Sequence, residues 1–107
     1  MAGLSSVQIQ ALRQELEEQL QRRLSQMESL KASAEGGTAA EMSWQDVEVA
    51  MAATDRAIAE TRRCLEMLDN GTYGRCEQCN AEIPFERLKI RPLARYCITC
   101  QRKQEAA

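Results

Sequence analysis

Apolar residues recur every three or four positions along the first third of the chain. This repeat consists of Ile9, Leu12, Leu16, Leu20, Leu24, Met27 and Leu30. The spacing predicts a helix with one apolar face, while Gln, Arg and Glu occupy the other faces. Ser5 and Gln8 have the spacing of a capping box, and Gly36-Gly37 is a stop signal. The predicted helix therefore covers about residues 5–34.

A second apolar repeat follows a linker that we predict over residues 35–42. This repeat consists of Val47, Met51, Thr54, Ile58, Thr61, Leu65 and Leu68. Ser43 and Asp46 form an N-terminal capping signal, and Gly71 suits a left-handed C-cap, so the second helix should cover residues 43–70. Cys64 falls on the apolar face, and we interpret it as a buried small side chain rather than a reactive thiol.

Two long amphipathic helices joined by a short connection predict an antiparallel hairpin. A dimeric coiled coil remains open on the same pattern. The chain has 107 residues, of which 4% are aromatic, so one small domain with leucine-rich and alanine-rich helix packing is expected. The hydrophobic core of a small chain is modest, and a bound metal or a disulfide often supplies additional stability.

Charge is distributed unevenly around a net value of −2. Residues 1–70 carry seven basic and twelve acidic side chains, whereas residues 71–107 carry seven and four. The acidic first part argues against binding nucleic acid over the whole chain. The sequence shows no signal-peptide pattern and no apolar run of about 18 residues. We therefore expect a cytoplasmic protein that does not enter a membrane.

Four of the five cysteines form two Cys-x-x-Cys pairs separated by 17 residues. The pairs are Cys76 with Cys79 and Cys97 with Cys100. Two such turns supply four thiolates, which suit the tetrahedral coordination of zinc. A redox dithiol, a pair of disulfides and an iron–sulfur cluster fit the spacing or the predicted compartment less well. Four protein ligands leave no open position, so the predicted cofactor is one structural Zn²⁺.

These elements together predict a mainly α fold. Residues 1–70 should form a helical hairpin, or coiled coil, and residues 71–107 a small four-cysteine zinc-finger domain with a C-terminal helix. Pro84 and Pro92 bracket a further short helix that we expect over residues 85–90. Gly74 and Asn80 tolerate the left-handed backbone that a tight zinc knuckle requires.

The segment from Gly71 to Cys100 resembles the zinc finger of the DksA/TraR family. The resemblance rests on three stretches: GTYGRCEQC at 71–79, IPFERLKIRP at 83–92 and CITC at 97–100. It implies a bacterial transcription regulator that binds RNA polymerase through the secondary channel, and not DNA directly. In that family a coiled coil enters the channel with an acidic tip, and some members act with the alarmone ppGpp.

The family's tip motif, Asp-x-x-Asp-x-Ala, is missing from the predicted turn. The acidic candidates for tip contacts are Glu35, Glu41 and Asp46, and a solvated loop with helix-start acids is the alternative for them. Arg91 matches a family position that contacts the alarmone or polymerase. Gln101 stands where ppGpp-responsive members have a lysine.

Two functions remain open on the sequence. The first is a DksA-like regulator docked on RNA polymerase, with ppGpp as a candidate second partner. The alternative is a zinc ribbon that binds nucleic acid or acts as a protein-interaction module. An enzyme is not expected, because the chain lacks histidine and the predicted metal site has no open position. Target promoters, the direction of regulation and the choice between monomer and dimer are not encoded in these patterns.

Overall fold

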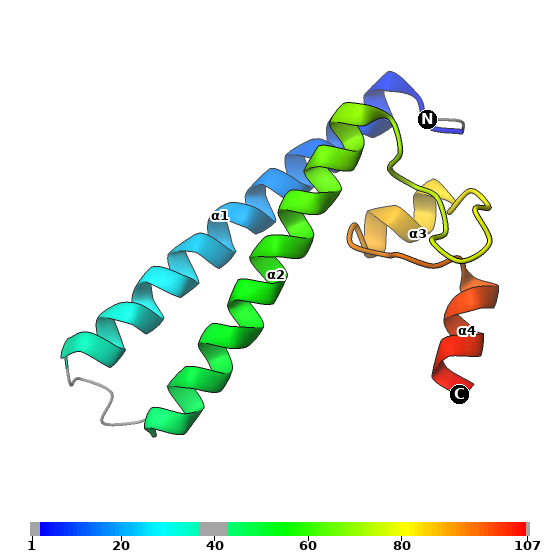
Figure 1. Cartoon of the computed structure of the whole chain (residues 1–107). Coiled ribbons are helices and arrows are strands. Elements are labelled where there is room, and N and C mark those ends of the chain that lie inside the picture. Colours follow the sequence, from blue (N-terminus) through cyan, green and yellow to red (C-terminus); the bar gives the residue numbers. More distant parts are fainter. Residues whose placement is uncertain (1–2, 37–42, 107) are drawn as a thin grey trace.

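The protein folds as two long antiparallel helices with a small finger beside one end (Figure 1). The computed structural model describes residues 3–36 and 43–106. Its helices are α1 (Ser6–Gly36), α2 (Trp44–Asn70), α3 (Phe85–Ile90) and α4 (Ile98–Ala106). Within those two ranges the structure has no β-strand, only an isolated antiparallel bridge between Arg75 and Glu82. The predicted fold class, a helical hairpin followed by a four-cysteine finger, is confirmed.

Local side-chain hydrogen bonds define both long helices at their starts. Ser5 and Gln8 form the reciprocal capping box, with N···O distances of 3.0 and 3.1 Å. The Ser43 hydroxyl accepts from the Asp46 N–H at 3.1 Å, and Gly71 ends α2 with φ 80°. Helix α1 continues two residues beyond the predicted end and includes Gly36, because glycine can still adopt helical dihedral angles.

The hydrophobic core lies where the finger packs against the base of the hairpin. Leu12, Leu16 and Leu68 of the hairpin meet Ile83 and Leu88 of the finger in one buried cluster. The second half of the α1 repeat lies beyond the finger and is only half-buried, since α2 alone covers it. These half-buried residues are Leu20, Leu24, Met27 and Leu30. Burial along the helix therefore depends on the finger as a third layer.

The apolar face of α2 is buried much as the repeat predicts. Its buried residues are Val47, Thr54, Ile58, Thr61 and Leu68. The two threonine hydroxyls donate to carbonyl groups one turn earlier, at 2.8 and 2.7 Å, so neither polar group is left unpaired. In the described part of the chain, no helix combines the length and apolar character that a membrane crossing needs.

Cys64 lies half-buried on α2 and packs against the core cluster. Burial raises the pKa of its thiol to about 11. A thiol with so high a pKa is almost entirely protonated at neutral pH and is a poor nucleophile. The structure agrees with the interpretation of Cys64 as a packing residue.

Candidate metal centre

The sulfur atoms of Cys76, Cys79, Cys97 and Cys100 converge in the finger. All four Sγ atoms lie within 4.8 Å of one another, and the Sγ atoms of Cys79 and Cys97 are 3.7 Å apart. A tetrahedral zinc site with Zn–S bonds of about 2.3 Å has sulfur–sulfur edges of about 3.8 Å. The cluster thus has the spacing and the soft donor set that zinc requires, and it can bind one zinc ion.

Two backbone turns place these sulfurs. The N–H of Cys79 lies 3.5 Å from Cys76 Sγ, and the N–H of Cys100 lies 3.5 Å from Cys97 Sγ. The first turn needs left-handed backbone on both sides, which Gly74 (φ 88°) and Asn80 (φ 61°) supply as predicted. The N–H of Cys76 donates to Ala81 O at 2.8 Å and closes the knuckle. The second turn opens directly into α4.

The four thiols differ in how readily they ionise. Burial opposes ionisation of Cys76, but backbone N–H groups, led by that of Cys79, outweigh it and lower its pKa to about 6. The N–H of Cys100 likewise lowers the pKa of Cys97. Burial and the neighbouring thiols raise the pKa of Cys100 to about 12. A bound dication would offset the repulsion that four converging thiolates create.

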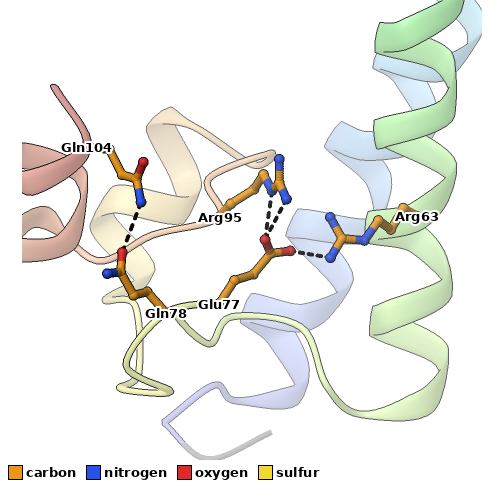
Figure 2. Close-up of polar contacts among 5 residues, drawn as sticks. All are labelled: Arg63, Glu77, Gln78, Arg95 and Gln104. Atoms are coloured by element: carbon orange, nitrogen blue, oxygen red, sulfur yellow. Dashed lines mark hydrogen bonds and ion pairs between the residues drawn. The ribbon is translucent and has the colours of Figure 1, made fainter. Parts of the chain in front are cut away.

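An ion-pair cluster beside the metal centre was not predicted from the sequence. Figure 2 shows Glu77, inside the first Cys-x-x-Cys turn, between Arg63 of α2 and Arg95. Burial opposes ionisation of Glu77, but hydrogen bonds from Arg95 and Arg63 outweigh it and hold its carboxyl pKa below the ordinary value. Sequence separations of 14 and 18 residues give no local pattern that could have revealed these pairs.

The finger is closed by further contacts between its two halves. Gln104 of α4 donates to the side chain of Gln78 at 3.0 Å (Figure 2). The Tyr73 hydroxyl donates to Pro92 O at 2.8 Å, and Tyr73 is only 3% exposed. Arg87 donates from Nε to Tyr96 O at 3.3 Å. Tyr73 is therefore a buried core residue whose hydroxyl is already hydrogen-bonded within the finger.

Two of the three predicted tip residues, Glu35 and Asp46, belong to the end of α1 and the start of α2, away from the finger (Figure 1). Asp46 is exposed in the first turn of α2. Glu35 lies in the last turn of α1, but its side chain is outside the described part, and Glu41 lies outside the described residues. Of the three acids, only Asp46 has a side chain in the described part of the chain, and the role of all three stays a prediction.

Arg91 is exposed at the C-cap of α3. It lines a shallow hollow together with Arg95, Tyr96 and Gln101. Arg91 and Gln101 are separated by ten positions in the sequence, yet the fold places them on one concave surface. The predicted alarmone position and the substituted lysine position therefore belong to the same place in the fold.

Comparison with known protein families finds matches to the finger. Residues 71–106 match the family model described as the prokaryotic dksA/traR C4-type zinc finger. An uncharacterized protein of Aquifex aeolicus is 44% identical over 48 residues, 45% of this chain and 33% of that protein. General stress protein 16O of Bacillus subtilis is 43% identical over 44 residues, 41% of this chain and 27% of that protein. The matches span a third or less of these relatives.

Comparison with solved structures extends the likeness to the hairpin. The structure of transcription factor DksA2 from Pseudomonas aeruginosa matches with a TM-score of 0.84 at 22% identity. The match covers 95% of this chain and 86% of that one. At this identity the match establishes the fold alone. Together the comparisons confirm the predicted resemblance: residues 71–106 match the dksA/traR C4-type zinc finger, and the chain with its hairpin resembles the DksA2 structure in fold.

Proposed function

Because the chain joins a dksA/traR C4-type zinc finger to the fold of DksA2, we propose that it is a DksA-like regulator of transcription. The observation that carries the proposal is the structural match over 95% of the chain, which includes the hairpin as well as the finger. The proposed partner is RNA polymerase, engaged through its secondary channel. Because that partner is cytoplasmic in bacteria, the proposal agrees with the predicted localisation.

In this proposal the finger has a structural role and the hairpin provides reach. Cys76, Cys79, Cys97 and Cys100 are the proposed ligands of one zinc ion, which holds the finger in the form that packs on the hairpin. Helix α1 contains 31 residues, and a helix of that length spans roughly 45 Å. An arm of this length can carry its far end deep into a narrow channel while the finger remains outside.

The alternative of a nucleic-acid-binding zinc ribbon has less support. Such a surface stacks bases on exposed aromatic side chains set among basic residues. Tyr73 is buried, Phe85 packs against the core, and Tyr96 is half-buried beneath Arg95. The hairpin segment, residues 1–70, carries five more acidic than basic side chains and would repel phosphates.

Binding to purified bacterial core RNA polymerase tests the proposal. Zinc-loaded protein, labelled at its N-terminus, should bind polymerase with a measurable change in fluorescence anisotropy. A second factor known to occupy the secondary channel should displace it. Failure to bind would refute the proposal. Binding to duplex or single-stranded DNA that weakens steeply with salt would favour the alternative.

In vitro transcription then tests regulation and the candidate alarmone. Reactions contain polymerase with and without this protein, each with and without ppGpp. Gln101→Lys supplies the cation that ppGpp-responsive members carry, next to Arg91 in the same hollow. We expect this variant to respond to ppGpp more strongly than the parent. An unchanged response would contradict a role for the hollow in alarmone binding.

A further inference from the structure

Glu77 is shared between the hairpin and both halves of the zinc finger. One carboxylate oxygen, Oε1, accepts from Arg63 of α2. The other, Oε2, accepts from Nε and Nη2 of Arg95, both at 2.8 Å. The Glu77 backbone N–H also donates to Arg95 O at 2.8 Å. Figure 2 shows the carboxylate lying between the two guanidinium groups.

This contact is the side-chain polar link between the finger and the long helices, in addition to the backbone hydrogen bond from the Tyr73 N–H to Met67 O at 3.2 Å. Among the described residues, no other side-chain hydrogen bond joins α1 or α2 to residues 73–106. Glu77 is also held in place from within the finger, since it lies between the metal-centre residues Cys76 and Cys79. When the Cys76–Cys79 turn is folded, the Glu77 carboxylate therefore has a fixed orientation toward Arg63.

The apolar contacts at the same interface have a different character. Leu12, Leu16 and Leu68 attract the finger through Ile83 and Leu88, but apolar burial depends on area and has little directional preference. A hydrogen-bonded ion pair to a planar guanidinium has a strongly preferred geometry. The apolar cluster can hold the finger on the hairpin, while the ion pair selects its angle.

Removal of the Glu77 charge would reverse the sign of the interaction here. The Glu77 side chain is 22% exposed and sits between two arginine side chains that are about half exposed. Without the carboxylate, Arg63 and Arg95 would face each other with like charges. Repulsion would then push the knuckle and α2 apart instead of drawing them together.

We propose that Glu77 fixes the orientation of the zinc finger on the hairpin, so that the folded metal centre sets the direction in which α1 and α2 project. Glu77 acts here as a positioning residue. This inference concerns the chain alone and does not need a partner. Its consequence for polymerase, that a fixed angle favours docking, rests on the proposed function.

Residual dipolar couplings of backbone N–H groups in the zinc-loaded protein test the orientation. In the parent, one alignment tensor should describe both α1–α2 and the finger. Arg63→Gln removes the link without altering the knuckle, and the exposed neighbour Arg62→Gln is the matched control. We expect loss of the common tensor in Arg63→Gln and its retention in Arg62→Gln.

Two further variants separate the charge effect from simple damage. Glu77→Gln should lose the common tensor while it retains one equivalent of zinc, and adding Arg95→Gln should restore part of the order by removing the repulsion. If Glu77→Gln fails to bind zinc, Arg63→Gln alone decides the matter. A single tensor of parental magnitude in Arg63→Gln would overturn the inference.

Polymerase binding provides a separate measurement. Arg63→Gln should bind core polymerase more weakly than Arg62→Gln, because a mobile finger loses more orientational freedom on docking. Equal affinities would overturn the docking consequence. Absence of binding by the parent would refute the proposed function, and the dipolar couplings would still decide the role of Glu77.

Discussion

Replacement of Leu16 by alanine tests where the core of this protein lies. Leu16 is 0% exposed in the first half of α1 and belongs to the cluster shared by the hairpin and the finger. Alanine has at least as high a helix propensity as leucine, so the helix itself should not be weakened. The loss should come from the buried side-chain atoms and from the cavity that they leave.

The magnitude follows from the burial of this side chain. Leu→Ala substitutions in closed cores cost about 2–5 kcal/mol, and the cost falls where the surroundings can collapse. Leu16 is closed on all sides, but one side is a small finger that can shift inward. We therefore expect a loss of about 3 kcal/mol in the free energy of unfolding.

Leu24→Ala is the matched control, because it makes the same substitution in the interior of the same helix. Leu24 is half-buried and lies beyond the cover of the finger. Alanine there leaves an open groove instead of a cavity, so the expected loss is about 1 kcal/mol. Differences in helix propensity cancel between the two variants.

Urea unfolding of the zinc-loaded protein, followed by circular dichroism at 222 nm, provides the comparison. With a slope of roughly 1.5 kcal/mol per molar urea, Leu16→Ala should lower the midpoint by about 2 M, and Leu24→Ala by less than about 1 M. Equal shifts would refute the reasoning, because they would mean that the finger does not close the core over Leu16.

Three further predictions concern the thiols and the hairpin end. Cys97→Ser should reduce bound zinc from one equivalent to none by elemental analysis, whereas Cys64→Ala should retain it; zinc loss in Cys64→Ala would show that the ligand set is wrong. Burial raises the pKa of Cys64 from 9.0 to about 11, so its thiolate fraction at pH 8 should be roughly 100-fold below that of an unperturbed cysteine. Iodoacetamide labelling of Cys64, mapped by mass spectrometry, should be correspondingly slow at pH 8. The labelling rate should rise as the pH approaches 11. Neutralising Glu35, Glu41 and Asp46 together, to Gln, Gln and Asn, should leave polymerase binding intact and abolish any effect on transcription if these acids replace the family's tip motif; parental activity of the triple variant would assign them to a solvated loop.

Features set by neighbours in the chain were predictable from the sequence. The capping box of Ser5 and Gln8, the Ser43 cap and the left-handed Gly71 each involve groups within a few residues of one another. The same holds for α3, whose observed bounds, Phe85–Ile90, match the prediction. Local hydrogen bonds and backbone preferences fix such features before distant parts of the chain meet.

The metal centre could be predicted because zinc chemistry limits the ligands to a few residue types and spacings. Two Cys-x-x-Cys turns were sufficient to name the four residues whose sulfurs converge. The sequence could not order the ionisation of the four thiols. That order depends on which sulfur is buried and which receives a backbone N–H, as with Cys100 and Cys76.

Tertiary structure alone decided how the finger sits on the hairpin. The repeat in α1 predicts that Leu16 and Leu24 lie on the same apolar face. Of the two, only Leu16 lies beneath the finger and is fully buried. The pairing of Glu77 with Arg63 and Arg95 likewise appears only when three distant segments meet. Periodicity defines which face of a helix is apolar, whereas the extent of burial and the choice of charge partners depend on what packs against that face.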